Sequence, residues 1–235
     1  IIEDLNDFNM GTSYFSSVDI IDYDNDGDDD LLIGFEGKIL MLNNKDGKFL
    51  MINQDLYGGE NIGNLYINNI WVDVNNDGFY DILSSKLHKN NNYNLYFIDP
   101  DFYINDTGYK VSVGDYNSDG FMDAIYTSWN SQQAIMMKNL NGIFTNANLP
   151  SLISVTGGVP SVFGDYNNDG KLDFILMEGS NGKLYSNNGN DNFTISTLNH
   201  SMEYVYDVKW GDFDNDGDLD LILTSSNITR IFENI

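Results

Sequence analysis

The sequence contains no cysteine, so disulfide bonds and thiol chemistry are excluded as sources of stability or activity. Its two histidines and three prolines are few for 235 residues. No apolar run approaches the roughly 18 residues that a membrane-spanning helix requires. Glycine, asparagine and aspartate recur throughout instead, which is typical of many short strands joined by turns. Without disulfides, a bound metal ion is one remaining way to strengthen such a fold.

Positive charge is also scarce, with 11 lysines and arginines against 36 acidic residues and a net charge of −25. Such a surface repels the phosphates of nucleic acids and of anionic membranes, so we expect neither as a partner. Two interpretations of the acidic excess remain. It forms a generic surface that keeps the protein soluble, or much of it is held for cations.

Catalytic motifs do not stand out in the sequence. It has no Gly-x-Ser-x-Gly nucleophile motif and no glycine-rich loop for phosphate. His88 and His200 both lie among polar turn residues, and we expect them to be solvent-exposed loop histidines. The sequence therefore predicts a protein that is not an enzyme.

One acidic motif occurs five times, with the pattern Asp-x-(Asp/Asn)-x-Asp-Gly-x-x-Asp. Successive copies begin 51, 42, 50 and 47 residues apart. A period of this size indicates a repeat architecture in which each copy is one supersecondary unit. The copies span 22–30, 73–81, 115–123, 165–173 and 212–220.

Short apolar segments flank every copy. One segment precedes each loop and two follow it. A fourth, weaker segment comes next, as in 49–54 and 193–198. In the second copy, the third segment is 94–99. Four strands per unit predict the blades of an all-β fold, a β-propeller. We expect one domain, 1–235, of five four-stranded blades, the last blade completed by the N-terminal strand so that the ring closes. The expected blades are 15–64, 65–107, 108–157, 158–203, and 204–235 with 1–14.

The acidic loops have the chemistry of calcium sites. Calcium takes about six to eight oxygen ligands in a flexible arrangement. Side chains at positions 1, 3, 5 and 9 supply oxygens, the glycine at position 6 allows a sharp turn, and position 7 would add its backbone carbonyl. Magnesium suits such a loop less well, and zinc would want histidine or cysteine. The predicted ligands of about five Ca²⁺ ions, one per blade, are Asp22, Asp24, Asp26, Asp28, Asp30, Asp73, Asn75, Asp77, Phe79, Asp81, Asp115, Asn117, Asp119, Phe121, Asp123, Asp165, Asn167, Asp169, Lys171, Asp173, Asp212, Asp214, Asp216, Asp218 and Asp220.

Two alternatives use the same residues. An EF-hand begins in the same way but needs a glutamate at position 12 and flanking helices, whereas position 12 is Ile33 in the first copy and glutamate in none. A metal-free turn is the other alternative, since Asp, Asn and Gly form hairpin turns on their own. Five copies with the same spacing of acidic residues within the loop favour a metal site over a metal-free turn. The first and fifth loops, with four ligand carboxylates each, are expected to bind most tightly.

With these loops the sequence resembles the FG-GAP/VCBS repeat family, the integrin-α-like calcium-binding propeller repeats that also occur in secreted adhesins and lectin-like proteins. The resemblance covers essentially the whole chain. It implies calcium in the hairpin between the first and second strands of each blade, with ligands bound on the opposite face. The Phe-Gly and Gly-Ala-Pro signatures of the integrin members do not recur from blade to blade.

Four segments are expected on that opposite face: 57–64, 84–94, 127–133 and 154–160. Within them, Trp129 beside Asn130 and Gln132 offers the apolar ring and amides that sugar binding uses. The sequence thus predicts a secreted, calcium-binding adhesion module for a glycan or an extracellular protein ligand. The first alternative is a structural subunit of an extracellular filament, coat or larger adhesin that self-assembles. A polysaccharide-active enzyme ranks behind both.

An extracellular location is expected because loops with dissociation constants of about 10⁻⁴–10⁻³ M fill only where calcium is abundant. Four sequons add a second indication, since they would be N-glycosylated in a eukaryotic source. Their asparagines are Asn105, Asn192, Asn199 and Asn227.

Overall fold

The computed structural model describes residues 15–35, 38–53, 68–84, 86–90, 96–103, 109–128, 134–147, 149 and 158–234. These residues form nineteen β-strands. They contain no helix long and apolar enough to cross a membrane. Within each sheet, strands that follow one another in sequence pair antiparallel, so each sheet is a meander.

Five sheets result, one for each acidic loop. The first contains β1 (Phe15–Ile21), β2 (Asp30–Phe35), β3 (Lys38–Lys45) and β4 (Lys48–Asn53). The second contains β5 (Ile70–Val72), β6 (Asp81–Leu83), β7 (Lys86–Asn90) and β8 (Tyr96–Tyr103). The third contains β9 (Tyr109–Gly114), β10 (Asp123–Ser128), β11 (Ile135–Leu140) and β12 (Ile143–Asn146). The fourth contains β13 (Ser161–Gly164), β14 (Asp173–Glu178), β15 (Asn181–Asn187) and β16 (Phe193–Asn199), and the fifth β17 (Asp207–Gly211), β18 (Asp220–Thr224) and β19 (Thr229–Phe232).

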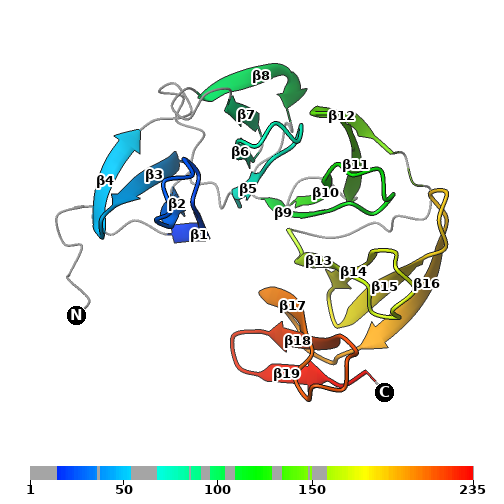
Figure 1. Cartoon of the computed structure of the whole chain (residues 1–235). Helices are drawn as coiled ribbons and strands as arrows, with labels where there is room; N and C mark the ends of the chain where they lie inside the picture. Colours follow the sequence, from blue (N-terminus) through cyan, green and yellow to red (C-terminus); the bar gives the residue numbers. More distant parts are fainter. Residues whose placement is uncertain are drawn as a thin grey trace.

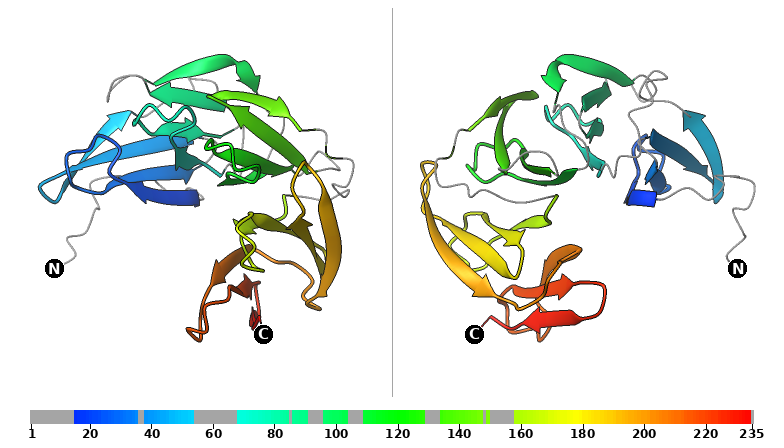
Figure 2. Two further views of the ribbon diagram at one scale, coloured as in Figure 1. Left: turned by 45° about the vertical axis from the view of Figure 1, so that its right-hand side comes forward. Right: turned by 180° about the vertical axis from the view of Figure 1, so that it is seen from behind.

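The sheets are arranged as the five blades of a β-propeller, as predicted. Each has its first strand toward the common centre and its last strand outside (Figure 1). First strands of successive blades touch, as β9 touches β13 and β13 touches β17. An opening separates the first blade from the fifth in both views of Figure 2. The fifth sheet has three described strands, and the N-terminal strand expected to complete it (1–14) lies outside the described residues.

Alternation along the second strand of each blade builds a core on both sides of it, because successive strand residues point to opposite faces. In β10, Ala124 joins the cluster shared with the second blade, whereas Ile125 joins the cluster shared with the fourth. We call the side of a blade that meets the preceding blade its leading face, and the other side its trailing face. The propeller is therefore held together by one hydrophobic cluster after another between neighbouring blades.

Aromatic residues before the acidic loops fill the space between first strands. Trp71 is buried and stacks on Tyr23 of the first blade, with ring centroids 5.6 Å apart. Trp210 lies against Gly164 of the fourth blade, where a Cβ would approach the indole to 2.5 Å. The glycine is needed at that point because no side chain fits beneath the ring.

Two expectations about the second blade and the histidines were wrong. The third strand of that blade is β7 at Lys86–Asn90. Of the segment 94–99, predicted as the third strand, residues 96–99 belong to the fourth strand, β8. His88 therefore lies within a strand and is buried, not exposed in a loop of the ligand face. His200 is also buried, and its Nδ1 accepts a hydrogen bond from the Met202 N–H at 3.1 Å. The polar neighbours of both histidines suggest exposure to solvent. Burial is decided instead by how the sheets pack, which the local sequence does not show.

Burial, with a smaller contribution from the nearby Lys86 ammonium, lowers the pKa of His88 from 6.5 to about 4. Since this pKa is lower in the folded state than in the unfolded state, the stability associated with neutral His88 is complete above pH 6.5 and is lost between about pH 6.5 and pH 4. As the pH falls through this range, the free energy of unfolding should decrease less for His88→Gln than for the wild type. The difference between the two decreases should reach up to about 3 kcal/mol. Urea unfolding at fixed calcium from pH 7.5 to 4.5 measures the difference, with Thr197→Gln, on the exposed side of β16, as control. Parallel curves for His88→Gln and the wild type would contradict the prediction.

Candidate metal centre

The aspartate at position 1 closes each acidic loop through its two carboxylate oxygens. In the fourth loop, Asp165 Oδ1 accepts the N–H of Asp169 at 3.0 Å and Oδ2 accepts the N–H of Gly170 at 2.9 Å. The same pair of bonds occurs in the other four loops, at 2.9–3.2 Å. The five sequence copies therefore share one three-dimensional turn.

Positions 3 and 5 continue the same hydrogen-bond pattern. Asn167 Oδ1 accepts the N–H of Asp169 at 3.0 Å, and Asp169 Oδ1 accepts the N–H of Lys171 at 2.9 Å. Position 4 has a φ between 55° and 63° in every loop. The glycine at position 6 also has a positive φ in every loop. Asparagine, which occupies position 4 in four of the five loops, tolerates this left-handed conformation better than most residues do. The turn thus orients the oxygen-bearing side chains before any cation is bound.

The aspartate at position 9 has a different environment from the rest of the loop. It is buried in all five blades, with at most 2% of its surface exposed in Asp30, Asp81, Asp123, Asp173 and Asp220. Its Oδ2 accepts the backbone N–H of position 2, and its Oδ1 accepts a backbone N–H at the end of the third strand. In the third blade these bonds come from Tyr116 at 3.2 Å and Asn139 at 2.8 Å. This aspartate therefore ties the loop to the third strand.

Burial, opposed in part by these hydrogen bonds, raises the pKa of this carboxyl in four blades. Charged aspartates of the same loop add to the effect. The pKa rises from 3.8 to about 6 for Asp30, Asp81 and Asp173, and to about 7 for Asp123. A carboxyl that is difficult to ionise in this setting gains from a nearby positive charge, which a cation in the loop would provide.

Positions 1, 3 and 5 come together in the two loops where all three are acidic, and their role as metal ligands stays a prediction. Oxygens of Asp22, Asp24 and Asp26 lie within 4.8 Å of one another, and so do those of Asp212, Asp214 and Asp216. Neither acidic group includes position 9. The donors are all oxygens, which are the ligands of hard cations such as calcium. The residues thus fit a calcium ion, held by positions 1, 3 and 5 with the buried aspartate beside them.

The fourth loop differs from the others in having a lysine at position 7. Lys171 Nζ lies 3.0 Å from Asp169 Oδ2, an oxygen that a cation would otherwise use. This hydrogen bond and ion pair lower the pKa of Asp169. Because the ammonium competes for the same carboxylate, we expect the fourth loop to bind a cation more weakly than the first and fifth.

An asparagine at the end of the third strand was missed by the sequence analysis. Asn139 Nδ2 donates to the carbonyl of Met122 in its own blade at 3.0 Å and to that of Val74 in the preceding blade at 2.7 Å. Asn187 repeats this with Leu172 at 3.0 Å and Tyr116 at 2.7 Å. The signal was available, since all five copies have asparagine there: Asn44, Asn90, Asn139, Asn187 and Asn234.

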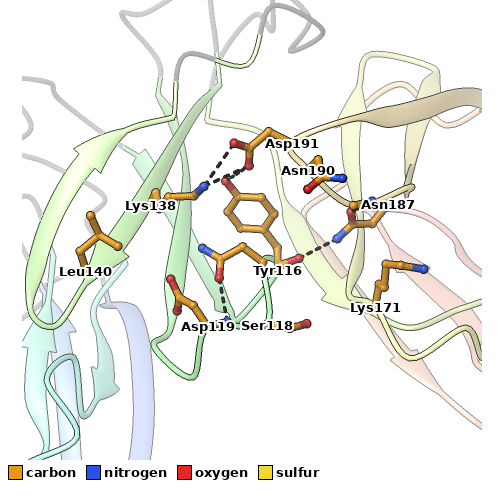
Figure 3. A pocket seen from close by; sticks show the side chains of 11 residues that line it. Tyr116, Ser118, Asp119, Lys138, Leu140, Lys171, Asn187, Asn190 and Asp191 are labelled. Carbon is orange, nitrogen blue, oxygen red and sulfur yellow. Dashed lines mark hydrogen bonds and ion pairs between the residues drawn. The ribbon is translucent and has the colours of Figure 1, made fainter.

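A cavity of about 500 Å³ lies between the third and fourth blades, beside the third acidic loop (Figure 3). At its rim Asp191 accepts a hydrogen bond from the Tyr116 hydroxyl at 2.8 Å and pairs with Lys138 at 3.2 Å. Asn187 and Lys171 line the side nearer the fourth blade. The cavity offers amide, ammonium and carboxylate groups to a polar ligand.

The predicted sugar-binding residues Trp129, Asn130 and Gln132 lie outside the described residues, as do 57–64 and most of 154–160. The asparagines of three sequons, Asn192, Asn199 and Asn227, are exposed. Asn105 lies outside the described part of the chain. Glycosylation and sugar binding at these residues stay predictions.

Asp123→Asn is expected to destabilise the protein both with calcium and in EDTA, by about 1–3 kcal/mol at pH 8. An amide has only one accepting oxygen, so the buried N–H of Tyr116 or of Asn139 would lose its acceptor. Asp119→Asn is the matched control, because its exposed side chain keeps an oxygen for the Phe121 N–H. It should reduce only the stabilisation by calcium. Urea unfolding of both variants, with and without EDTA, makes the comparison, and equal effects in EDTA would refute the structural role of Asp123.

The FG-GAP-like repeat family matches residues 115–176 and 165–223, two overlapping stretches that each run from one acidic loop into the next blade. A comparison with curated protein sequences gives no significant match.

Among solved structures, an Agrocybe aegerita lectin described for specific recognition of non-reducing terminal N-acetylglucosamine is similar, with a TM-score of 0.59 at 17% identity. The match covers 90% of this chain but only 61% of the lectin chain. A Photorhabdus luminescens Tc holotoxin pore has a TM-score of 0.49 at 16% identity, covering 92% of this chain and 11% of that one. The complex of BBS1N with ARL6DN has a TM-score of 0.46 at 13% identity, covering 94% and 79%. At these identities the lectin supports the fold alone.

The third, fourth and fifth acidic loops lie within the two family matches, and their hydrogen bonds are the same in all five blades. Residues 115–176 and 165–223 are therefore FG-GAP-like repeats, in agreement with the resemblance found in the sequence.

Proposed function

We propose that this propeller is a secreted, calcium-binding module that binds a glycan or an extracellular protein and has no catalytic activity of its own. The observation that carries the proposal is the repeated loop geometry, in which oxygens of positions 1, 3 and 5 converge, as in Asp22, Asp24 and Asp26. FG-GAP-like repeats commonly bind calcium, which supports the choice of ion.

The cation would act on the structure rather than on a substrate. Each loop joins the first two strands of its blade, and neighbouring loops touch. Asn76 Nδ2 donates to the Gly120 carbonyl at 2.8 Å, and Asn168 Nδ2 donates to Asp218 Oδ1 at 2.6 Å. Without a cation, the carboxylates of one loop repel one another across a few ångströms. Calcium would remove this repulsion and stabilise both the blade and its contact with the next blade.

The size of this effect supports an extracellular location. At a calcium concentration ten times the dissociation constant, each site contributes about 1.4 kcal/mol, and five independent sites about 7 kcal/mol. This is comparable with the net stability of a whole domain, about 5–15 kcal/mol. A propeller that depends on weak calcium sites is suited to calcium-rich surroundings outside the cell.

Two surfaces are candidates for the ligand. One is the predicted face with Trp129, on the side away from the acidic loops. The other is the cavity beside the third loop, where Asn187, Asn190 and Lys138 present polar groups. The similar lectin recognises N-acetylglucosamine, which makes a sugar the first ligand class to test here. Removal of calcium would weaken the second surface directly, because Tyr116 and Asp119 belong both to this cavity and to the loop.

Calcium removal is the first test of the proposal. We expect EDTA to lower the melting temperature strongly, and calcium to restore it better than magnesium does. Asp24→Asn should weaken one of the tightest sites in isothermal titration calorimetry, since it removes a carboxylate from the first loop. Asp29→Asn is the matched control, because it makes the same charge change at an exposed position outside the ligand set. An unchanged melting temperature in EDTA would reject the calcium sites.

Glycan-array binding is the second test. We expect the calcium-loaded protein to bind a subset of glycans, Trp129→Ala to reduce that signal about tenfold or more by removal of the stacking ring, and Asn190→Ala to leave it unchanged. The reverse pattern would place the ligand in the cavity beside the third loop and overturn the assignment to Trp129. Self-assembly without glycan binding would favour the structural subunit, and turnover of a polysaccharide would favour the enzyme.

A further inference from the structure

Four positions define the leading face of an interior blade. Two of them lie on the first strand, at the fourth and the second residue before the acidic loop begins. The third lies on the second strand and directly follows position 9 of the loop. In the second blade these are Asn69, Trp71 and Ile82, all buried. In the third and fourth blades, Val111, Ala124 and Phe174 are buried at these positions, and the other three residues, Val113, Ser161 and Phe163, are half-buried. The fourth position is the third-strand asparagine, which donates to the loop of the preceding blade.

The trailing face of a blade is defined in the same way. It consists of position 2 of the loop, the second residue after position 9, and the residue three before the third-strand asparagine. In the third blade these are Tyr116, Ile125 and Met136, all buried against the fourth blade. The carbonyl of position 2 accepts the asparagine of the following blade, as Tyr166 accepts Asn234 Nδ2 at 2.7 Å.

At the first blade the first-strand part of the leading face is uncovered, whereas Leu31, directly after position 9, is half-buried. Val18 is 66% exposed and Ile20 is 58% exposed, although their counterparts in the second blade are buried. Asn44 Nδ2 donates to the Asp29 carbonyl of its own blade at 3.0 Å, whereas Asn139 and Asn187 each donate also to a preceding blade. Within the described part of the chain, Asn44 Oδ1 has no hydrogen-bond partner.

At the fifth blade two of the three side chains of the trailing face are exposed, and the third, Ile222, is half-buried. Phe213, at position 2, is 48% exposed, and Ile231 is 58% exposed, whereas Met41, Leu87 and Met136 at the position of Ile231 are buried. The ring of Phe213 lies against Gly211 of its own blade. In the third and fourth blades the corresponding glycines meet an aromatic ring of the following blade instead.

We propose that these two faces are the two sides of one docking site, and that its occupant is a further blade of the same FG-GAP-like class. Such a blade brings a trailing face to Val18 and Ile20 and a leading face to Phe213 and Ile231. Its loop carbonyl at position 2 accepts Asn44, and its third-strand asparagine donates to the carbonyl of Phe213. Every contact continues an interface that already exists between the five blades.

The position of the two faces selects a single blade over a second copy of this chain. Both faces border the opening between the first and fifth blades (Figure 2), where a further blade would stand. A second copy docked by its first blade on the fifth blade would carry four more sheets toward the space of the first blade. Steric overlap therefore disfavours it.

The experiment appends a second copy of residues 158–203, the fourth blade, after Ile235 of the full chain. We expect a monomer that melts in one transition, about 5 °C or more above the 235-residue chain at the same calcium concentration. Asn187→Ala in the appended copy should remove much of this gain, because the hydrogen bond to the Phe213 carbonyl is lost. Ser196→Ala on the exposed side of the appended copy is the matched control and should retain it. An appended blade that stays protease-sensitive, or gives no gain, overturns the proposal.

Ile20→Ser and Ile231→Ser test the same faces without relying on the appended blade alone. In the 235-residue chain each change should shift the melting temperature by less than about 2 °C, since exposed side chains contribute little. In the extended chain each should lower it clearly. If both already destabilise the 235-residue monomer, another part of this chain covers the faces and the proposal is wrong. If the 235-residue chain self-associates in sedimentation and Ile20→Ser abolishes this, the occupant is a second copy, and the proposal is equally overturned.

Discussion

The buried aspartate at position 9 is the group on which each blade depends. Asp123 accepts one backbone N–H from the acidic loop and one from the third strand, so the hairpin and the next strand are fixed relative to each other. Burial makes its ionisation unfavourable and raises its pKa to about 7. The cluster of oxygens at positions 1, 3 and 5 offers a place for the cation that would compensate this unfavourable charge. One side chain per blade would thus couple the fold to the proposed metal site.

The same loops connect one blade with the next. The third-strand asparagine links position 8 of its own loop to position 2 of the preceding loop, as Asn187 does with Leu172 and Tyr116. Stabilising one loop therefore also stabilises an interface between blades. This explains how small contributions at separate sites can stabilise a propeller whose blades are joined covalently only by the chain itself.

The acidic motif predicted most of the architecture because its requirements are local. The spacing of aspartates, the glycine at position 6 and the apolar segments on either side identify the hairpin between first and second strands wherever they occur. The third strand of the second blade was misplaced because Lys86–Asn90 is polar in composition, whereas 94–99 contains more apolar residues. The burial of His88 was not predicted either, because the neighbouring sheet, and not the local sequence, removes this residue from water.

By itself the sequence determined the repeated unit, its strands around each acidic loop and the oxygen-rich chemistry of that loop, because these depend on residues within a few positions of one another. Only the tertiary structure decided which of those residues are buried and what they meet. Asp24 and Asp30 are equally acidic in the sequence, yet Asp24 joins the oxygen cluster while Asp30 is enclosed between strands. Ile20 and Trp71 occupy the same position in two repeats, yet one is exposed and the other covered. The difference arises because a preceding blade packs on Trp71, and contacts between blades join residues that are about fifty positions apart in the chain.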